Sequence, residues 1–271
     1  MIIFSNAKLN IGLNIIKKRF DDYHDIQTIY IPISLYDIIE IIPSNKDEFI
    51  FYGESCNELN KSIEENTCYR ALMIIKDKVK LPPIKVIIYK KIPMKSGLGG
   101  GSSNAVFFVK LLNEIFNLKF SIYEIFDIVK QIGLDCAFFV YNKPMYGKGK
   151  GDILKKINLN LKQYKCALII SNNINISTKF AYALVKPKKP SFNLFNITKI
   201  NIEDWKNFVV NDFEIPMFKI YPELKCYKDY LYEQGALYAG MTGSGSTIFG
   251  IFKEKKNLVL NDCKVIWVDF I

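Results

Sequence analysis

The alternation of apolar and polar positions along the chain predicts strands wherever β-branched and aromatic residues dominate. In the first half, these runs are Ile2–Phe4, Leu9–Ile16, Gln27–Ile42, Phe49–Tyr52 and Ile84–Tyr89. In the second half, they are Cys166–Ile170, Gly235–Ala239, Ser246–Phe252 and Val265–Phe270. We therefore expect a sheet in each half of the chain.

Apolar residues that recur every three or four positions predict helices between these strands. The segments with this pattern are Asn57–Lys78, the run from Ala105 to Phe116, Thr178–Val185 and Met217–Gln234. Pro222 lies inside the last of them, so it must stand in a first helical turn or force a break. A further helix is expected to begin at Ser121, because Ser121 followed by Glu124 is typical of a capping box.

Strands and helices that are segregated in both halves are typical of an α+β protein with antiparallel sheets. Between the halves, the segment Gly147–Asp152 has three glycines at alternate positions, which predict a turn. The length of 271 residues suits one large domain or two closely joined ones. We expect two domains, residues 1–150 and residues 151–271.

A cluster of glycines immediately precedes the helical run that begins at Ala105. Four glycines occupy the five positions from Gly97 to Gly101, and Ser102 or Ser103 stands where a helix N-cap belongs. Glycine lets consecutive backbone N–H groups turn inward and lets a ligand approach the main chain closely. A flexible surface turn would give no reason for so many glycines. The segment is therefore interpreted as an anion cradle at a helix start, with a di- or triphosphate as the expected anion.

The spacing of this segment differs from two common phosphate-binding patterns. It lacks the lysine-serine or lysine-threonine pair that ends a P-loop, and it does not fit the dinucleotide fingerprint.

Composition favours an ordinary globular protein, with 49% hydrophobic residues. Residues 1–10 lack the basic segment and long apolar run of a secretory signal, and no stretch approaches the length of a membrane span. The six cysteines are scattered without a C-x-x-C pair, which argues against a zinc site or a disulfide framework. We expect a cytoplasmic protein with reduced thiols, no membrane partner and no metal held by protein ligands.

The formal charge of +10 raises the alternative of a basic RNA-binding module. The lysines are spread along the chain in short clusters, which is typical of a solvated surface. An RNA-binding module would also leave the glycine cluster unexplained. We therefore expect no nucleic-acid partner and a field that attracts small polyanions such as nucleotides.

Three segments resemble the signature motifs of one family. They are Asn6–Asn10, the glycine-rich stretch Pro93–Ala105 and Met241–Ser246. In this order they are similar to the three motifs of the superfamily of galactokinase, homoserine kinase, mevalonate kinase and phosphomevalonate kinase, the GHMP kinases. The resemblance implies a small-molecule kinase with a two-domain α+β fold, mainly antiparallel sheets, ATP in the interdomain cleft, and a monomer or weak homodimer.

Within the superfamily, Arg19–Asp25 followed by Thr28 is similar to the R-x-D-G-Y-H-x-x-x-T segment of one subfamily. That subfamily phosphorylates a cytidine-diphosphate-linked methylerythritol in non-mevalonate isoprenoid biosynthesis. Further similar blocks are Ser34–Asp37, Glu65–Asn66 with Arg70–Ala71, Gly133–Asp135, Asn211–Glu214 and Tyr221–Leu224. A mevalonate or homoserine kinase is the alternative, and it would share the glycine segment but not Tyr23–His24.

Two positions depart from the subfamily pattern. Asp22 stands where the subfamily has glycine, and Ala137 stands where it has proline. Aspartate tolerates a left-handed backbone better than most residues. Neither departure touches an expected reacting group.

The resemblance implies that Asp135 is the general base toward the substrate hydroxyl. It also implies that Lys8 positions this hydroxyl and stabilises charge. Phosphoryl transfer to an alcohol needs these functions. From the sequence alone, Asp135 has an equally good alternative as a helix N-cap, and Lys8 could be a surface lysine at a strand edge.

The resemblance also implies a cytidine site. Tyr23 is expected to stack on the pyrimidine while His24, the single histidine, hydrogen-bonds to the base edge. Tyr182 is expected on the opposite face, with Phe180 as the near alternative, and ordinary helix packing is the competing role for both. The complete expected substrate set is Asn10, Tyr23, His24, Asp135, Thr178, Tyr182, Thr242 and Gly243.

ATP is the expected cofactor, with Mg²⁺ bridging its phosphate oxygens. The residues expected to contact ATP are Asn66, Lys95, Gly97, Leu98, Gly99, Gly100, Gly101, Ser102 and Ser103. No dedicated protein ligand for the metal is evident, although Ser102 or Ser103 could touch it.

Overall fold

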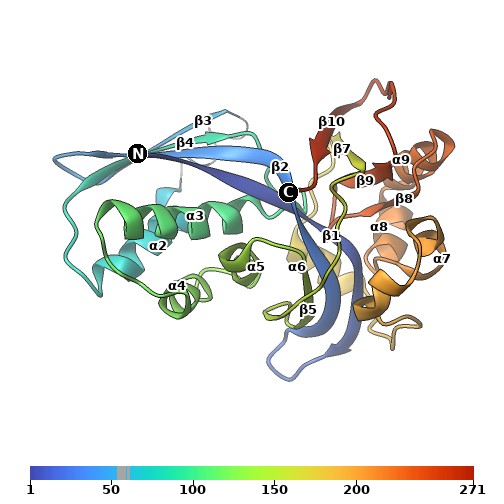
Figure 1. The fold of residues 1–271 in the computed structure, drawn as a ribbon, viewed down its shortest axis with the longest axis horizontal. Helices are drawn as coiled ribbons and strands as arrows, with labels where there is room; N and C mark the ends of the chain where they lie inside the picture. Colours follow the sequence, from blue (N-terminus) through green and yellow to red (C-terminus); the bar gives the residue numbers. More distant parts are fainter. Residues whose placement is uncertain (54–58, 60–61) are drawn as a thin grey trace. The chain divides into compact units, whose positions relative to one another are not determined.

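The computed structural model describes residues 1–53, 59 and 62–271, and within them the chain forms two compact units (Figure 1). Unit 1 consists of residues 1–7, 35–94 and 99–142. Unit 2 consists of residues 8–34, 95–98 and 143–271. Both units are discontinuous in sequence, because two long strands and the glycine-rich segment supply residues to each of them. The division into domains 1–150 and 151–271 stays a prediction.

Unit 1 contains β3 (Glu48–Gly53), β4 (Ile84–Lys90), the first part of β1 (Ile2–Lys18) and the last part of β2 (His24–Pro43), all in one sheet. The end of β2 runs antiparallel to β4, and β3 runs parallel to β4. The prediction of two separate strands in residues 2–16 was wrong. Ser5 and Asn6 interrupt the apolar pattern, yet both are buried and hydrogen-bonded within one continuous strand.

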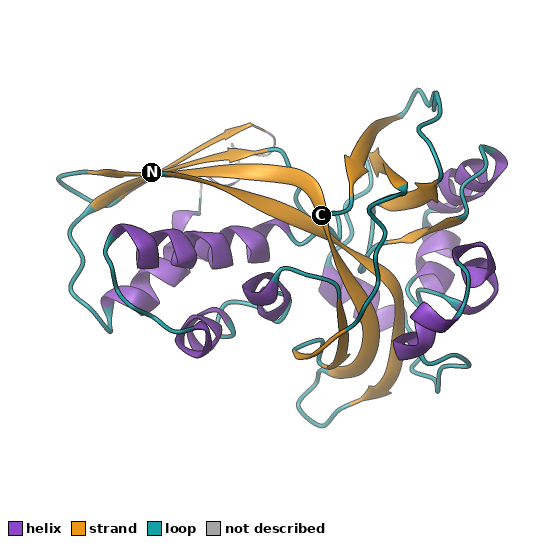
Figure 2. Ribbon diagram, in the orientation of Figure 1, coloured by secondary structure: helices purple, strands orange, loops and turns teal. Residues whose placement is uncertain are grey.

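The helices of unit 1 lie on one face of this sheet (Figure 2). They are the 3₁₀ helix η1 (Ile63–Glu65), α2 (Thr67–Lys76), α3 (Gly100–Ile115), α4 (Ile122–Val129) and α5 (Cys136–Tyr141). Helix α2 packs on α3, and their apolar faces bury Leu72 and Val109 completely. The predicted capping box is confirmed, because Ser121 and Glu124 bond each other's backbone N–H groups.

The predicted helix Asn57–Lys78 is shorter than expected. Residues 57, 58, 60 and 61 lie outside the described part of the chain. Asn66 is extended, and its side-chain oxygen accepts the backbone N–H of Cys68 at 2.8 Å. An asparagine side chain that accepts a backbone N–H group two residues later acts as an N-cap. Asn66 therefore starts α2 and does not continue a helix from residue 57.

Unit 2 begins with a hairpin against β2. Strand β5 (Met145–Gly149) pairs with Ile26–Tyr30 of β2 and with β6 (Ile153–Lys156), in both cases antiparallel. The turn predicted for Gly147–Asp152 is confirmed only at residues 150–152, where it joins β5 to β6. Gly147 and Gly149 do not break the regular structure but lie inside β5. Gly147 is required there because a Cβ atom would lie 2.5 Å from the Tyr30 ring.

The second sheet of unit 2 is antiparallel, in the order β10-β7-β9-β8. Its strands are β7 (Lys165–Ser171), β8 (Tyr238–Met241), β9 (Ile248–Phe252) and β10 (Cys263–Asp269). All four overlap the predicted strands. Strand β8 begins later than predicted, because Gly235 has a φ of +90° just after a helix, the conformation that ends helices.

The helical elements of unit 2 are α6 (Thr178–Leu184), η2 (Leu194–Lys199), η3 (Ile202–Asp204), α7 (Trp205–Phe208), α8 (Glu214–Ile220) and α9 (Pro222–Glu233). The predicted helix 217–234 is broken at Tyr221, and Pro222 stands at the first position of α9, as the proline rule requires. Helix α9 packs on β8 and β9, and its Leu224 and Leu231 are fully buried.

The expected α+β class with mainly antiparallel sheets is confirmed, and the β3–β4 pair is a parallel exception. Among the described residues, no helix has both the length and the apolar character that crossing a membrane requires. The five described cysteines are free thiols, and Cys56 lies outside the described residues.

Candidate active site

The first turn of α3 presents backbone N–H groups without a side-chain cap. The N-cap is Gly99, in a left-handed conformation with φ of +75°, and the helix begins at Gly100. The prediction of Ser102 or Ser103 as the N-cap was wrong, because the glycines themselves make the turn into the helix. Helices leave their first N–H groups without intrahelical partners, so this end of α3 can accept an anion.

Side chains of unit 1 fix this turn from outside. Thr67 donates its hydroxyl to the carbonyl oxygen of Gly101 at 2.7 Å. Ser103 is fully buried and donates its hydroxyl to the Asn6 carbonyl oxygen at 2.6 Å. Ser103 therefore anchors the helix, and Ser102 is the less buried of the two predicted hydroxyls.

Residues 95–98 of the same segment belong to unit 2, where Lys8 holds them. The backbone N–H of Lys8 donates to the Leu98 carbonyl oxygen at 3.0 Å. The Lys8 ammonium donates to the Gly97 carbonyl oxygen at 2.8 Å. Thr242 also donates its hydroxyl to that carbonyl, at 3.3 Å. The segment is thus fixed through its backbone oxygens.

Lys8 is a buried residue with 2% exposure, so its alternative as a surface lysine is wrong. Its ammonium also donates to the Asn10 side-chain oxygen and lies 5.9 Å from the centre of the Tyr30 ring. The backbone N–H of Asn10 donates to the Thr242 hydroxyl at 2.9 Å. The structure therefore brings together four of the predicted residues, Lys8, Asn10, Gly97 and Thr242.

The motif Met241–Ser246 is held by Asn211, to which the sequence motifs gave no role. The buried Asn211 donates its amide to the carbonyl oxygens of Met241 and Gly243, at 2.7 and 2.8 Å. Thr178, at the start of α6, lies 3.3 Å from the Ser244 hydroxyl. The block Asn211–Glu214 was the available signal for Asn211, but its contacts were not visible in the sequence.

Asp135 stands directly before α5 but does not cap it. Its backbone is right-handed helical, and its side chain makes no capping hydrogen bond. Asp135 therefore stands at the N-cap position of α5, as the alternative had it, but its side chain does not cap the helix. Lys110 of α3 fixes the other end of α5, because its ammonium donates to the carbonyl oxygens of Phe139 and Val140 at 2.9 and 3.0 Å.

The neighbouring thiol is not a reactive group. Burial, together with the negative charge of Asp135, raises the pKa of Cys136 to about 12. Cys136 is therefore protonated at neutral pH and is not a nucleophile.

His24 and Tyr182 form a stacked aromatic pair within unit 2, with ring centroids 4.8 Å apart and an interplanar angle of 21°. Phe213 packs edge-on against Tyr182 at 4.9 Å. Burial lowers the pKa of His24, and the nearby charge of Lys18 lowers it further, so the imidazole is neutral at pH 7. A neutral imidazole can donate one hydrogen bond and accept another.

The chain is similar to known proteins of one kinase family. A model described as GHMP kinases N terminal domain matches residues 66–143, and one described as GHMP kinases C terminal matches residues 197–262. A 4-diphosphocytidyl-2-C-methyl-D-erythritol kinase from Azobacteroides pseudotrichonymphae is 44% identical over 94% of both chains. One from Bacteroides fragilis is 39% identical over 97% of this chain and 96% of its own. The chain belongs to this family of GHMP kinases.

Solved structures agree with this family. A crystal structure of 4-(cytidine 5'-diphospho)-2C-methyl-D-erythritol kinase, 26% identical, covers 93% of this chain and 90% of its own with a TM-score of 0.76. The mevalonate kinase of Methanococcus jannaschii, at 19% identity, shares the fold with a TM-score of 0.72. As a family member, this GHMP kinase is an ATP-dependent small-molecule kinase.

Four further predicted residues, Asn66, Lys95, Tyr23 and Phe180, differ in exposure and contacts. Asn66 uses its side-chain oxygen to cap α2, and Lys95 is exposed with a positive φ of 53°. Tyr23 is 49% exposed, and the Lys150 ammonium lies 4.6 Å from its ring centre. Phe180 is 41% exposed on α6. Their roles toward ATP or the cytidine stay predictions.

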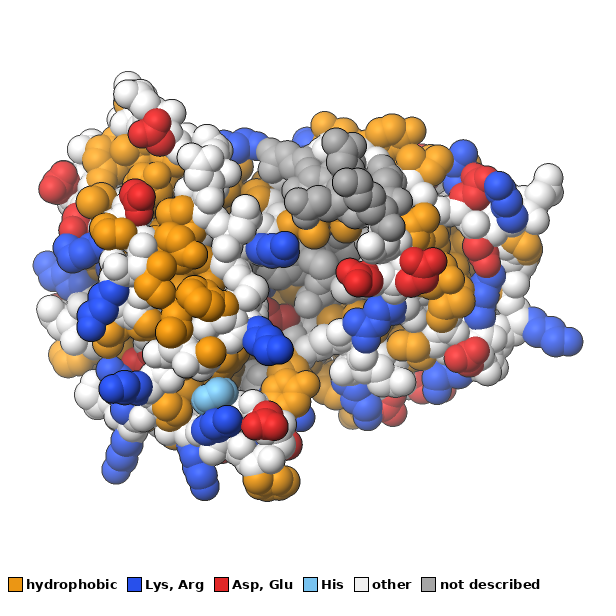
Figure 3. Space-filling view, turned by 180° about the vertical axis from the view of Figure 1, so that it is seen from behind, with side chains coloured by type: hydrophobic (Ala, Val, Ile, Leu, Met, Phe, Trp, Pro, Cys, Tyr) orange, Lys and Arg blue, Asp and Glu red, His pale blue; other side chains and the backbone are white. Residues whose placement is uncertain are grey.

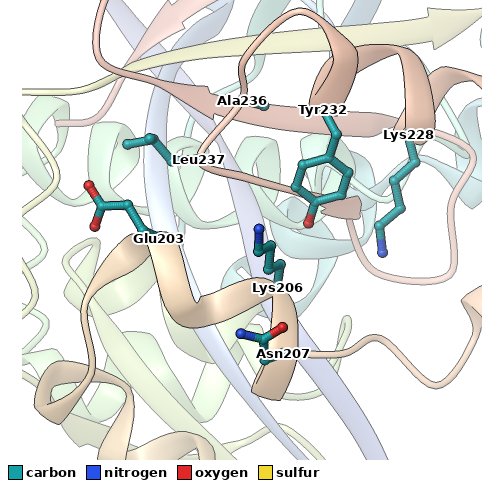
Figure 4. A pocket seen from close by; sticks show the side chains of 7 residues that line it. All are labelled: Glu203, Lys206, Asn207, Lys228, Tyr232, Ala236 and Leu237. Atoms are coloured by element: carbon teal, nitrogen blue, oxygen red, sulfur yellow. The ribbon is translucent and has the colours of Figure 1, made fainter.

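A cavity of about 500 Å³ lies elsewhere in unit 2 of this kinase (Figure 4). It is lined by Glu203, Lys206, Asn207, Lys228, Tyr232, Ala236 and Leu237. None of these belongs to the predicted site. Lys228 pairs with Glu214 at 2.7 Å, and the Tyr232 hydroxyl donates to the Ala239 carbonyl oxygen at 3.2 Å, so two of its polar groups already have partners.

Basic side chains of the kinase are scattered over the face drawn in Figure 3, among apolar and acidic ones. This distribution agrees with the spread of lysines along the sequence and with a solvated surface.

Proposed function

We propose that the protein transfers the γ-phosphoryl group of ATP to the 2-hydroxyl of 4-diphosphocytidyl-2-C-methyl-D-erythritol, a step of non-mevalonate isoprenoid precursor biosynthesis. The observation that carries the choice of substrate is the stacked pair His24–Tyr182. The pair brings together an aromatic ring and a neutral imidazole from two distant parts of the chain. Recognition of a cytosine needs both, because the ring can stack on the base and the imidazole can form a hydrogen bond with it. A mevalonate or homoserine kinase has no base to recognise in its acceptor.

The phosphates of ATP bind at the uncapped first turn of α3, from Gly99 to Ser102. The left-handed Gly99 aims successive N–H groups in one direction, and the positive end of the helix dipole favours the negative charge of a triphosphate. Gly101 has no side chain to cover these groups, and a Cβ atom there would meet nothing closer than 3.7 Å. Space for a ligand and free donors therefore coincide at this turn.

Asp135 accepts the proton of the attacking hydroxyl as the new oxygen–phosphorus bond forms, and ADP leaves with the bonding electrons of the broken phosphoanhydride. Its side chain makes no capping hydrogen bond to α5. Lys8 offsets negative charge on the transferring group and orients the hydroxyl. Its buried ammonium is already held in one direction by Asn10 and Gly97, so little reorganisation is needed.

Mg²⁺ bound with ATP would neutralise part of the charge of the phosphates. The described residues contain no group of three or more His, Cys, Asp or Glu side chains that could hold a metal. The phosphates and water would therefore supply most of its ligands, with Ser102 as the protein hydroxyl at the turn. This donor set fits a hard cation that retains water.

The cytosine of the acceptor contacts His24 and Tyr182. The two rings are in direct stacking contact, so the base stacks on Tyr182 only when His24 moves off this ring. The neutral His24 can then donate to or accept from the base edge, while Tyr182 keeps its support from Phe213. Asn10, Thr178, Thr242 and Gly243 line the rest of the acceptor site in this proposal, with Tyr23 at its exposed edge.

Tyr182→Ala is expected to raise the KM for the cytidyl acceptor by about tenfold, because base–aromatic stacking is worth about 1–3 kcal/mol. The KM for ATP should stay unchanged. Phe180→Ala is the matched control, since it removes an exposed ring from the same helix, and its effect should be about twofold or less. Steady-state kinetics of the two variants measure this. The reverse order of effects would move the stacking role to Phe180.

The assignment of function as a whole is tested by coupled ADP release. The protein should release ADP with 4-diphosphocytidyl-2-C-methyl-D-erythritol and ATP, and should release little with mevalonate or homoserine. Activity with a free alcohol, and none with the cytidyl acceptor, would assign the chain another reaction within the GHMP kinases.

In this proposal, the enzyme acts on small molecules in the cytoplasm, as a monomer or weak homodimer without nucleic-acid or membrane partners. The five described free thiols support a reducing compartment.

A further inference from the structure

A buried charged cluster lies beneath the N-terminal turn of α3 in unit 1. Asp37 of β2 is fully buried, and Lys90 at the end of β4 is 5% exposed. One oxygen of the Asp37 carboxylate accepts the Lys90 ammonium and, at 2.9 Å, the side-chain amide of Asn104. Asn104 is in α3, one turn after the helix begins.

The other carboxylate oxygen of Asp37 accepts two backbone N–H groups, from Lys91 at 2.7 Å and from Ile92 at 2.8 Å. A carboxylate has room for about four hydrogen bonds, so Asp37 is saturated. The Lys90 ammonium also donates to the Asn104 side-chain oxygen at 2.8 Å. Asn104 completes the cluster by donating to the buried Ser5 hydroxyl at 2.8 Å.

These contacts give Asp37 an unusual position between two segments. It binds the backbone at the end of β4, where the glycine-rich segment departs, and it binds the helix that this segment enters. The packing above the cluster is tight, because a Cβ atom on Gly100 would lie 2.9 Å from the Ile92 side chain and 3.4 Å from the Lys90 nitrogen. The helix start therefore rests directly on residues that Asp37 holds.

Stability alone does not explain such a cluster. Burying an ion pair costs desolvation that its mutual attraction often fails to recover, and apolar residues of the same volume are frequently as stable. A saturated network of directed bonds does something that apolar packing does not, because it fixes one orientation of the groups it joins. Here those groups are the end of β4 and the first turn of α3.

We propose that Asp37, acting through Lys90 and Asn104, is a positioning residue for the phosphate-binding turn. It sets the direction of α3 so that the N–H groups of Gly100 to Ser102 meet the phosphates of ATP. This rests on the proposed binding of ATP phosphates at that turn. It also gives a role to the block Ser34–Asp37, which the sequence analysis noted without assigning a function.

The experiment compares Asn104→Ala with Asn113→Ala. Both remove an asparagine from α3, but Asn113 bonds the backbone of Phe120 near the other end of the helix. Asn104→Ala should raise the KM and the dissociation constant for ATP by about tenfold, because small misplacements of binding groups cost up to about 10²-fold. The KM for the cytidyl acceptor should not change. Asn113→Ala should change ATP binding about twofold or less, even if both variants melt at lower temperature.

A second variant covers the case in which Asn104→Ala does not fold. Asp37→Asn combined with Lys90→Met removes both buried charges while keeping similar volumes, and it should show the same selective loss of ATP affinity. Equal ATP affinity in the two asparagine variants, or an unchanged affinity in the double variant, would contradict the positioning role. The cluster would then serve only the stability of the fold. Direct titration with ATP separates this from the function proposal. A wild-type protein that binds ATP but does not phosphorylate the cytidyl acceptor contradicts only the substrate assignment.

Discussion

Asp135→Asn is expected to lower kcat by about 10²-fold or more, because it removes the general base and general acid–base catalysis contributes about 10²–10⁴-fold. The dissociation constant for ATP should change little. The substitution keeps the size of the side chain, and Asp135 makes no capping bond that α5 would lose. The loss should therefore appear in the chemical step and not in folding or in nucleotide binding.

Single-turnover measurement of phosphoryl transfer checks this expectation, together with titration by ATP. Asp127→Asn is the matched control, since this exposed carboxylate of α4 pairs with Lys130 at the surface. That variant should retain wild-type turnover. If Asp135→Asn also turned over at the wild-type rate, another group would have to accept the proton.

The sequence predicted best what depends on neighbouring residues. The capping box at Ser121, the break at Pro222 and most strands follow from local chemistry, and the structure confirms them. Asp22 is a sharper case. It replaces a glycine of the subfamily pattern, and its φ of 61° shows the left-handed backbone that aspartate was expected to tolerate.

What the sequence could not predict depends on contacts between distant segments. Asn66 ends one helical run because its side chain is needed to start the next, and Ser5 and Asn6 remain in a strand because buried partners satisfy them. The N-cap of α3 was misplaced for a similar reason. Serine is the usual capping residue, but here Ser103 turns to Asn6 and leaves the cap position to Gly99.

The candidate site shows the same division. The motifs indicated Lys8, Asn10, Gly97 and Thr242 separately, and their hydrogen bonds to one another join three segments that local patterns cannot relate. Asn211 and Asp37 were visible only as members of similar blocks. Their functions lie in which backbone groups they hold, and that information is contained in the tertiary structure.

Gly97→Ala is the second substitution with a large expected effect. Gly97 has a φ of +78°, and a Cβ atom there would lie 2.1 Å from the carbonyl oxygen of Thr242. That oxygen belongs to the backbone of the motif Met241–Ser246, so it cannot move away as a flexible side chain would. Alanine must shift the segment and break the bonds that Lys8 and Thr242 make to the Gly97 carbonyl oxygen.

We expect Gly97→Ala to lower the free energy of unfolding by about 2–4 kcal/mol, as the sum of backbone strain and steric conflict. Gly101→Ala is the matched control. Its Cβ atom would meet Thr67 at 3.7 Å, an ordinary contact, and alanine is the better helix former by about 0.8–1 kcal/mol. In thermal unfolding followed by circular dichroism, Gly97→Ala should therefore melt at a clearly lower temperature than Gly101→Ala, although the two glycines are only four positions apart. Equal melting of both variants would mean that the Lys8 and Thr242 contacts do not hold the segment in place.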